Sequence, residues 1–279
     1  MASPQGVTGS TMPRRQLGRH LRDLRNRARM TTRTAATQLE WSEAKIWRIE
    51  TGQTSLRSLD VEAMCKVYGA PDDLVEPLAA LARETKARGW WTSYNDVIPE
   101  GFDVYIGLEE AASALSIYEN GLVPALLQTE DYTRALLEQA QPDLTDAELD
   151  RRLRVRAARQ ALLVRPESPL RLHVVLAEAV LTRRIGDDRV LAGQRAWLRE
   201  LADRDTVRIQ VVPADTGYHS GLESGRFTIL EFDGSGDKPE PPVVYVETFA
   251  GTAYLDKPNE HDRYRGAFTD ICAAASGSV

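Results

Sequence analysis

The sequence predicts an all-α head of five helices followed by an α+β domain with a small mixed sheet. Apolar residues follow helical spacing as far as about Gly89, whereas runs rich in β-branched and aromatic residues occur only in the last third. At 279 residues with 42% apolar content, the chain is long enough for two packed cores. We therefore expect a disordered tail at residues 1–13, a helical domain at 14–89 and an α+β domain at 90–279.

Composition excludes several classes of protein. No run of about 18 apolar residues is present, and the first residues lack the apolar core of a secretion signal, so we expect a cytoplasmic protein without a membrane partner. The two cysteines, Cys65 and Cys272, are far apart, and the four histidines are scattered singly. We expect no disulfide scaffold, no metal site and no cofactor.

Charge is distributed unevenly along the chain. The segment from Arg14 to Arg57 contains eleven Lys or Arg residues and four Asp or Glu residues. Its charge is therefore +7, in a chain of net charge −6. A basic head on an acidic body favours a polyanion as the partner of the head alone. The alternative is a helix face that is merely solvated.

The first helix of the head is predicted by apolar residues at helical spacing, which would form one buried face, with basic residues on the other faces. The apolar face comprises Leu17, Leu21, Leu24 and Ala28. The arginines expected outside the core are Arg15, Arg19, Arg22 and Arg25.

Four further helices are predicted in the head. The second lies around Ala35 to Leu39, and the third begins after Ser42, a good N-cap, and ends at Gly52. Two helices joined by so short a turn fit a helix-turn-helix. A fourth helix, capped by Ser58, stops at Gly69, and a fifth is expected from about Pro77 to Gly89.

The third helix, at residues 42–51, has one side suited to burial and one suited to reading DNA. Ile46 and Ile49 share a face, and Trp47 points away from it, either along the DNA backbone or as a core bridge to the fourth helix. The N-terminal part of such a helix meets base edges in the major groove. The residues of this helix that we expect at the DNA interface are Ser42, Glu43, Ala44, Lys45, Trp47 and Arg48. The residues expected to flank the phosphates are Arg14, Arg15, Arg19, Arg33 and Arg57.

The segment from Leu17 to Tyr68, with RMTTRTAATQLEWSEAKIWRIETGQTSL at its centre, resembles the Xre/Cro-type helix-turn-helix domain. The recurrent residues of that pattern are here Ser42, Ile46, Arg48, Ile49, Glu50 and Gly52. The resemblance implies a DNA-binding transcriptional regulator, and it places Thr32 where the family has a DNA-contacting glutamine. Glu40 replaces a glycine usual in the turn, at a cost of about 1 kcal/mol if the position is left-handed.

Segments of the remainder, among them YIGLEEAASALSIYENGLVPALLQTEDYTRALL and VLAEAVLTRRIG, resemble the C-terminal domain of WhiJ-like regulators. That resemblance implies regulation rather than catalysis, with a small regulatory protein partner. A small-molecule effector is the alternative partner of this domain. For DNA binding we expect a homodimer on two half-sites of double-stranded DNA, because such domains pair two-fold symmetry with palindromic operators.

Helices are expected in the body at about 107–120 and 130–139, from a Thr145 capping box to about 163, and at 187–202. Strands are expected from Leu170, Val207, Phe227 and Val243, the first two parallel and the later two antiparallel.

No enzyme motif accompanies the polar residues on or beside the strands. These are His173, Glu178, His219 and Glu247, and we expect neither a catalytic site nor an enzyme.

The glycine-rich stretch around His219 is either a loop over a ligand site or a plain hairpin. The arginine run at 151–159 is either a second nucleic-acid surface or the solvated face of an amphipathic helix. The alternative for the whole chain is a protein-interaction module without specific DNA binding.

Overall fold

The computed structural model describes residues 11–86, 89–99, 101–233, 240–249 and 251–276. The chain divides into two compact units, Met1–Ala111 and Ala112–Val279, and each is described by itself. No helix in the described part of the chain is both long and apolar enough to span a bilayer.

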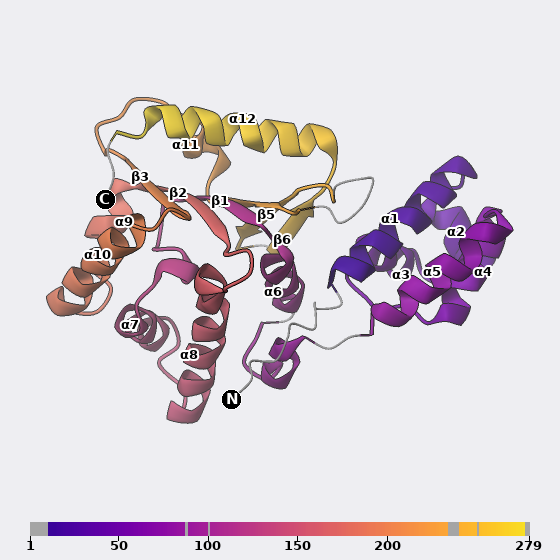
Figure 1. The fold of residues 1–279 in the computed structure, drawn as a ribbon, viewed down its shortest axis with the longest axis horizontal. Coiled ribbons are helices and arrows are strands. Elements are labelled where there is room, and N and C mark those ends of the chain that lie inside the picture. The colour runs from indigo at the N-terminus through magenta and orange to yellow at the C-terminus, as the bar shows by residue number, and fades with distance from the viewer. Residues whose placement is uncertain (1–10, 87–88, 100, 234–239, 250, 277–279) are drawn as a thin grey trace. The chain divides into compact units, whose positions relative to one another are not determined.

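The first unit consists, in its described residues, of helices and their connections (Figure 1). Its elements are α1 (Thr11–Arg27), α2 (Thr32–Leu39), α3 (Glu43–Glu50), α4 (Ser58–Tyr68), α5 (Asp72–Glu84), the 3-10 turn η1 (Trp90–Tyr94) and α6 (Phe102–Ala111). The first five helices share one apolar core, in which Leu21, Ile46 and Met64 are fully buried. The predicted five-helix head is therefore confirmed.

The ends of α1 differ from the prediction. The helix begins at Thr11, inside the expected tail, whose residues 1–10 lie outside the described residues. A Cβ on Gly107 of α6 would lie only 1.9 Å from the hydroxyl oxygen of Thr11, so the two helices meet where glycine leaves room. At the other end, Ala28 is exposed rather than buried, because α1 stops at Arg27.

The starts of α4 and α5 also differ. Ser58 is the first residue of α4 rather than its cap, and its hydroxyl donates to the Ala79 carbonyl at 3.2 Å. The predicted stop of α4 at Gly69 is confirmed by its left-handed φ of 64°. α5 begins at Asp72 and ends at Glu84, so Pro77 stands inside the helix and not in its first turn.

The second unit contains a six-stranded mixed sheet in the order β3-β2-β1-β4-β5-β6. The strands are β1 (Ala114–Glu119), β2 (Arg171–Ala177), β3 (Val207–Val212), β4 (Phe227–Glu231), β5 (Val243–Thr248) and β6 (Gly251–Leu255). β1, β2 and β3 run parallel, and β1–β4, β4–β5 and β5–β6 pair antiparallel. The predicted parallel and antiparallel pairs, and the α+β class, are confirmed.

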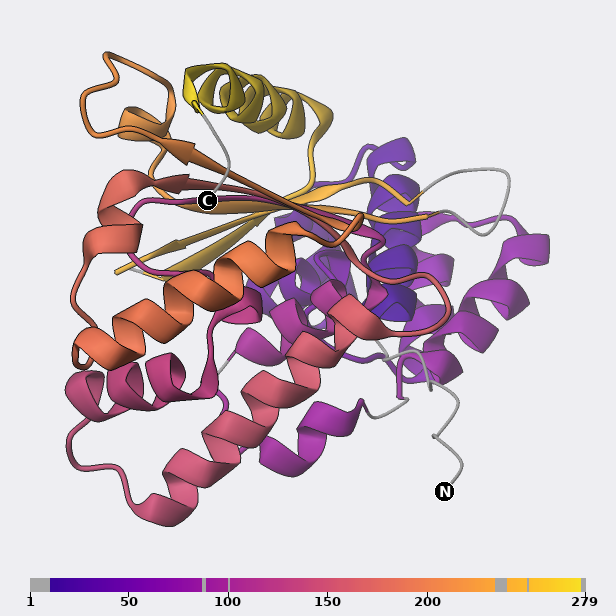
Figure 2. The same ribbon diagram turned by 60° about the vertical axis from the view of Figure 1, so that its left-hand side comes forward.

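Helices cover the two faces of this sheet, as Figures 1 and 2 show. The helices of the unit are α7 (Glu130–Ala140), α8 (Asp146–Gln160), α9 (Glu178–Thr182), α10 (Asp188–Ala202), α11 (Gly221–Ser224) and α12 (Pro258–Ala274). Short 3-10 turns η2 (Ala125–Leu127) and η3 (Ala161–Val164) flank α7 and α8. α12 packs on one face through Phe268 and Ile271, against Val175 and Phe227 of the sheet. α7, α8 and α10 lie on the other face.

The prediction for the segment 107–120 is wrong after Ala111. The residues from Ala114 form β1, an inner strand of the sheet between β2 and β4, in which Leu115, Ile117 and Tyr118 are buried. Pairing with β2 on one side and β4 on the other stabilises an extended conformation that the local helical spacing does not reveal. The predicted helices at 130–139 and 187–202 and the Thr145 capping box are confirmed.

The connection from β3 to β4 carries His219 and is not a hairpin. β3 lies at one edge of the sheet and is separated from β4 by β2 and β1, so the chain must cross the sheet. The connection is held by the buried His219, whose Nδ1 accepts from the Gly221 N–H at 3.1 Å, and by Ser220, which donates twice to Asp270.

Candidate nucleic-acid interface

The turn between α2 and α3 is fixed by one left-handed residue and one side-chain cap. Glu40 has φ 56° and ψ 37°, and the next N–H, that of Trp41, donates to the Ala36 carbonyl at 2.8 Å. The Ser42 side chain accepts from the Lys45 N–H at 3.2 Å, which confirms it as the N-cap of α3. The angle between the two helices is therefore set by their own local sequence.

The buried side of α3 docks closely on α1. Ile46 and Ile49 are 0% and 2% exposed, as their shared face predicts. A Cβ on Gly18 of α1 would lie 2.5 Å from the Ile49 carbonyl oxygen and 2.9 Å from that of Glu50, so only glycine permits this approach. α3 is thereby held as a rigid element on the helical core.

A buried ion pair adds a second link between α1 and α3. The Arg25 guanidinium donates to both carboxylate oxygens of Glu50, at 2.6 and 2.7 Å, and to the Met30 carbonyl at 2.8 Å. Both side chains are almost excluded from solvent. Arg25 therefore orders the turn after α1 as well as α3, and the prediction that it stays outside the core is wrong.

The opposite side of α3 is open. Glu43, Ala44, Trp47 and Arg48 are all exposed, Trp47 to 55%. The alternative in which Trp47 is a core bridge to the fourth helix is therefore wrong. The Arg48 Nε donates to the Ala44 carbonyl at a long 3.4 Å, which leaves the outer nitrogens of the guanidinium for another acceptor.

Lys45 is half-buried because its ammonium lies over the ring of Trp41, 3.3 Å from the centroid. Such a contact between a cation and an aromatic face holds the charge at the start of α3. Trp41 did not figure among the predicted site residues, although its spacing of four from Lys45 is the available signal. Arg25 and Glu50 did not figure as a pair either, and in their case the pairing across 25 positions has no local sequence signal.

The predicted flanking arginines have different surroundings. Arg33, on α2, is 85% exposed and lies 3.8 Å from the Glu43 carboxylate at the start of α3. Arg57 is exposed and forms a two-bond pair with Asp60, which raises the pKa of the arginine and lowers that of the carboxyl group. Arg19 is half-buried.

Two other arginines of α1 face inward. Arg15 is 4% exposed, against the expectation that it stays outside the core, and its backbone lies within 2.9 Å of where a Cβ on Gly52 would be. Arg14 donates to the Thr85 carbonyl at 3.1 Å, and burial lowers its pKa. Neither position supports a contact with phosphate, because the side chains are already engaged in the packing of the helical unit.

Thr32 is the first residue of α2 and is half-buried. The cap of that helix is Thr31, whose side chain accepts from the Thr34 N–H at 3.0 Å. Thr32 therefore stands at a helix N-terminus, where backbone N–H groups favour an anion.

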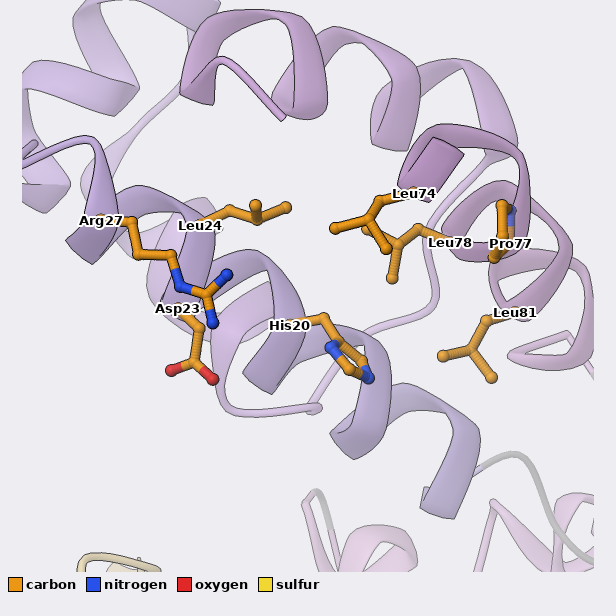
Figure 3. Close-up of a pocket in the computed structure, with 8 residues that line it drawn as sticks. All are labelled: His20, Asp23, Leu24, Arg27, Leu74, Pro77, Leu78 and Leu81. Carbon is orange, nitrogen blue, oxygen red and sulfur yellow. The ribbon is translucent and has the colours of Figure 1, made fainter. Parts of the chain in front are cut away.

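A separate groove of about 210 Å³ lies between α1 and α5 (Figure 3). Its residues are Leu24, Leu74, Pro77, Leu78 and Leu81, with His20, Asp23 and Arg27 from α1. No residue of α2 or α3 lines it. A molecule bound in this groove would therefore leave the exposed side of α3 accessible.

In the second unit, the four polar residues considered for catalysis have separate local partners. His173 bonds to Gln210 at 2.7 Å, and Glu178 accepts from the Ala214 N–H at 2.7 Å. Glu247 accepts from Arg226 at 3.0 Å, and His219 is buried in the connection described above. No hydrogen bond or ion pair joins any two of these four among the described residues.

The arginines of residues 151–159 lie on α8. Leu149 and Leu153 of this helix are buried and so is Arg159, whereas Arg154 is exposed. The helix is amphipathic, and at least one arginine of the run belongs to its packed side.

A capped helix held on a helical core with a polar face open to solvent defines the first unit as a helix-turn-helix domain, and residues 16–78 match a family with that description. Residues 102–278 match the family described as "Domain of unknown function (DUF5753)". Because this match covers more than half of the chain, the protein belongs to the DUF5753 family. No curated protein and no solved structure gives a significant match. The helix-turn-helix domain supports DNA binding and a role in transcription regulation.

Proposed function

We propose that the protein is a sequence-specific transcriptional regulator of the Xre type that reads DNA with α3, while its WhiJ-like second unit senses an effector or a small regulatory protein. The observation that carries the proposal is the division of α3 into a buried side, Ile46 and Ile49, and an exposed side, Glu43, Ala44, Trp47 and Arg48. B-DNA's major groove admits one α-helix, and only its exposed side can reach base edges.

Three of the exposed side chains of α3 each suit a base. Arg48 matches the O6 and N7 acceptors of guanine, Glu43 accepts from cytosine N4, and the Ala44 methyl packs on the methyl of thymine. Trp47 lies along the sugar-phosphate backbone. Arg33, Arg57 and the N-terminus of α2 at Thr32 hold phosphates and set the register, without reading sequence.

The experiment is selection of bound duplexes from a random pool with the full chain. Enrichment of one sequence, with an affinity that falls as salt rises, supports the proposal, because neutralised phosphates release counterions. No enrichment, together with affinity indifferent to salt, would favour the alternative of a protein-interaction module.

The proposed homodimer would use the groove between α1 and α5. Leu74 at its edge is 37% exposed, and the rim carries both Asp23 and Arg27. Two copies related by a two-fold axis present the same patch to each other, so each carboxylate meets the guanidinium of the other copy. Leu74→Asp should lower the sedimentation coefficient of the full chain from that of a dimer to that of a monomer. Lys66→Asp, an exposed change on α4, is the control.

A further inference from the structure

The second unit contains a pocket of about 410 Å³ whose lining residues all belong to that unit. Its lining residues belong to α9, α10, the end of β3 and the segments after β3 and α12. Figure 1 shows where these elements lie. The chain passes from β2 directly into α9 at Glu178 and leaves β3 at Pro213, and both residues line the pocket.

Two arginines of α10 face this pocket from one side of the helix. Arg195 and Arg199 are four residues apart, so their side chains are neighbours on the helix surface. The Arg195 Nε donates to the Leu181 carbonyl at 2.7 Å, which fixes the guanidinium plane and leaves its outer nitrogens available. Among the described residues, neither arginine forms an ion pair with a carboxylate.

The remaining lining explains what kind of molecule would fit. Leu181, Val211 and Pro213 provide an apolar surface beside the two cations. Glu178 also lines the pocket, but one of its carboxylate oxygens accepts the Ala214 N–H at 2.7 Å. The segment after α12 completes the wall, and its Ser276 N–H donates to the Val211 carbonyl at 3.1 Å.

We propose that this pocket binds a small organic anion, whose carboxylate or phosphate group is held by Arg195 and Arg199 and whose apolar body rests on Leu181, Val211 and Pro213. A planar guanidinium suits both anions, because it offers parallel N–H groups to two oxygens. The site deepens the proposed function by giving the sensing unit a ligand class, and its regulatory meaning rests on that function. Binding itself does not require DNA.

The test is calorimetric titration of the full chain, without DNA, using sodium benzoate, phenyl phosphate and neutral benzyl alcohol as probes. We expect saturable binding of at least one anion and weaker binding of the alcohol. A preference for phenyl phosphate or for benzoate identifies which anionic group the site takes. Binding of the alcohol as tight as that of both anions, or no binding of either anion, would overturn the proposal.

Variants connect the binding to the pocket. Arg199→Ala should weaken the anion about ten- to a hundredfold, the value of one charge-assisted hydrogen-bonded contact. Arg199 is exposed, so the change should leave the fold intact. Arg189→Ala removes an exposed arginine of the same helix that does not line the pocket, and it should leave the affinity unchanged. Equal losses in both variants would show that the anion binds elsewhere by net charge.

The same titrations separate this proposal from the function of the first unit. If no duplex is enriched in the selection experiment but Arg199→Ala still weakens anion binding as expected, the pocket stands and the DNA-binding proposal fails. If duplexes are enriched but neither anion binds, the pocket proposal alone fails.

Discussion

Arg25 and Glu50 form a two-bond ion pair that lies almost out of solvent and ties the end of α1 to the last residue of α3. The guanidinium has a third acceptor, the Met30 carbonyl, in the turn that leads to α2. One side chain therefore connects three consecutive helices of the helix-turn-helix unit.

Removing one partner of this pair should be costly. Arg25→Met leaves the Glu50 carboxylate buried without its partner, and we expect the free energy of unfolding to fall by about 3 to 5 kcal/mol. The double variant Arg25→Met, Glu50→Leu should regain most of the loss, because no charge remains buried. Urea unfolding of the full chain measures both. A double variant as unstable as the single one would mean that the hydrogen bond to Met30 matters more than the charge.

Glu40 adopts a left-handed conformation, in which its Cβ causes strain. The sequence predicts this strain for a turn position where glutamate stands in place of glycine. Glu40→Gly should raise the free energy of unfolding by about 1 kcal/mol, because glycine has no Cβ to clash in this region. Glu40→Ala is the matched control, since alanine keeps the Cβ and should give no comparable gain. Equal stabilisation by both substitutions, measured by urea unfolding, would contradict the conformational explanation.

Arg48 and Arg33 should differ in how they affect DNA affinity. Arg48→Ala should cost about 1 to 3 kcal/mol on the selected operator and relax the preference at one base pair. Arg33→Ala should weaken binding to all DNA sequences alike. It should also reduce the slope of log affinity against log salt concentration by about 1. Lys66→Ala, which removes an exposed charge on α4, controls for net charge in binding titrations across salt. A uniform loss for Arg48→Ala would reassign that residue to phosphate.

Glu119, at the end of β1, should make the stability of the second unit depend on pH. Burial raises the pKa of this carboxyl group to about 7, with a further rise from Glu247, while Arg226 and the Gly121 N–H oppose the rise. The folded state thus holds a proton that the unfolded chain releases near its ordinary pKa of 4.5. Stability from this group is complete below about pH 4.5 and is lost as pH rises through about 7.

Glu119→Gln keeps the shape of the protonated side chain at every pH. Relative to the parent chain, its free energy of unfolding should rise between pH 5 and 8, by about 1 to 3 kcal/mol at pH 8. Glu200→Gln, an exposed change on α10, should show a difference that does not vary over the same range. A constant difference for Glu119→Gln as well would exclude a raised pKa in the folded state.

The sequence by itself determined the local features of this protein. The Ser42 cap, the alternation of Ile46 and Ile49 with exposed residues, the stop at Gly69 and the Thr145 capping box each depend on residues within a few positions of one another. Short-range hydrogen bonds and helical periodicity act in the isolated segment, so they leave a readable pattern.

Only the tertiary structure decided which polar side chains are buried. It also decided that a segment with helical spacing forms a strand. Arg25 is buried because Glu50, 25 positions away, supplies a partner, and Arg15 is buried where α1 meets Gly52. Residues 114–119 become β1 because β2 and β4, distant in sequence, offer hydrogen bonds on both sides. In the same way, the pocket beside Arg195 and Arg199 exists only where α10 packs next to the ends of β2 and β3. Contacts of this kind depend on the whole packed unit and leave no periodic trace in the chain.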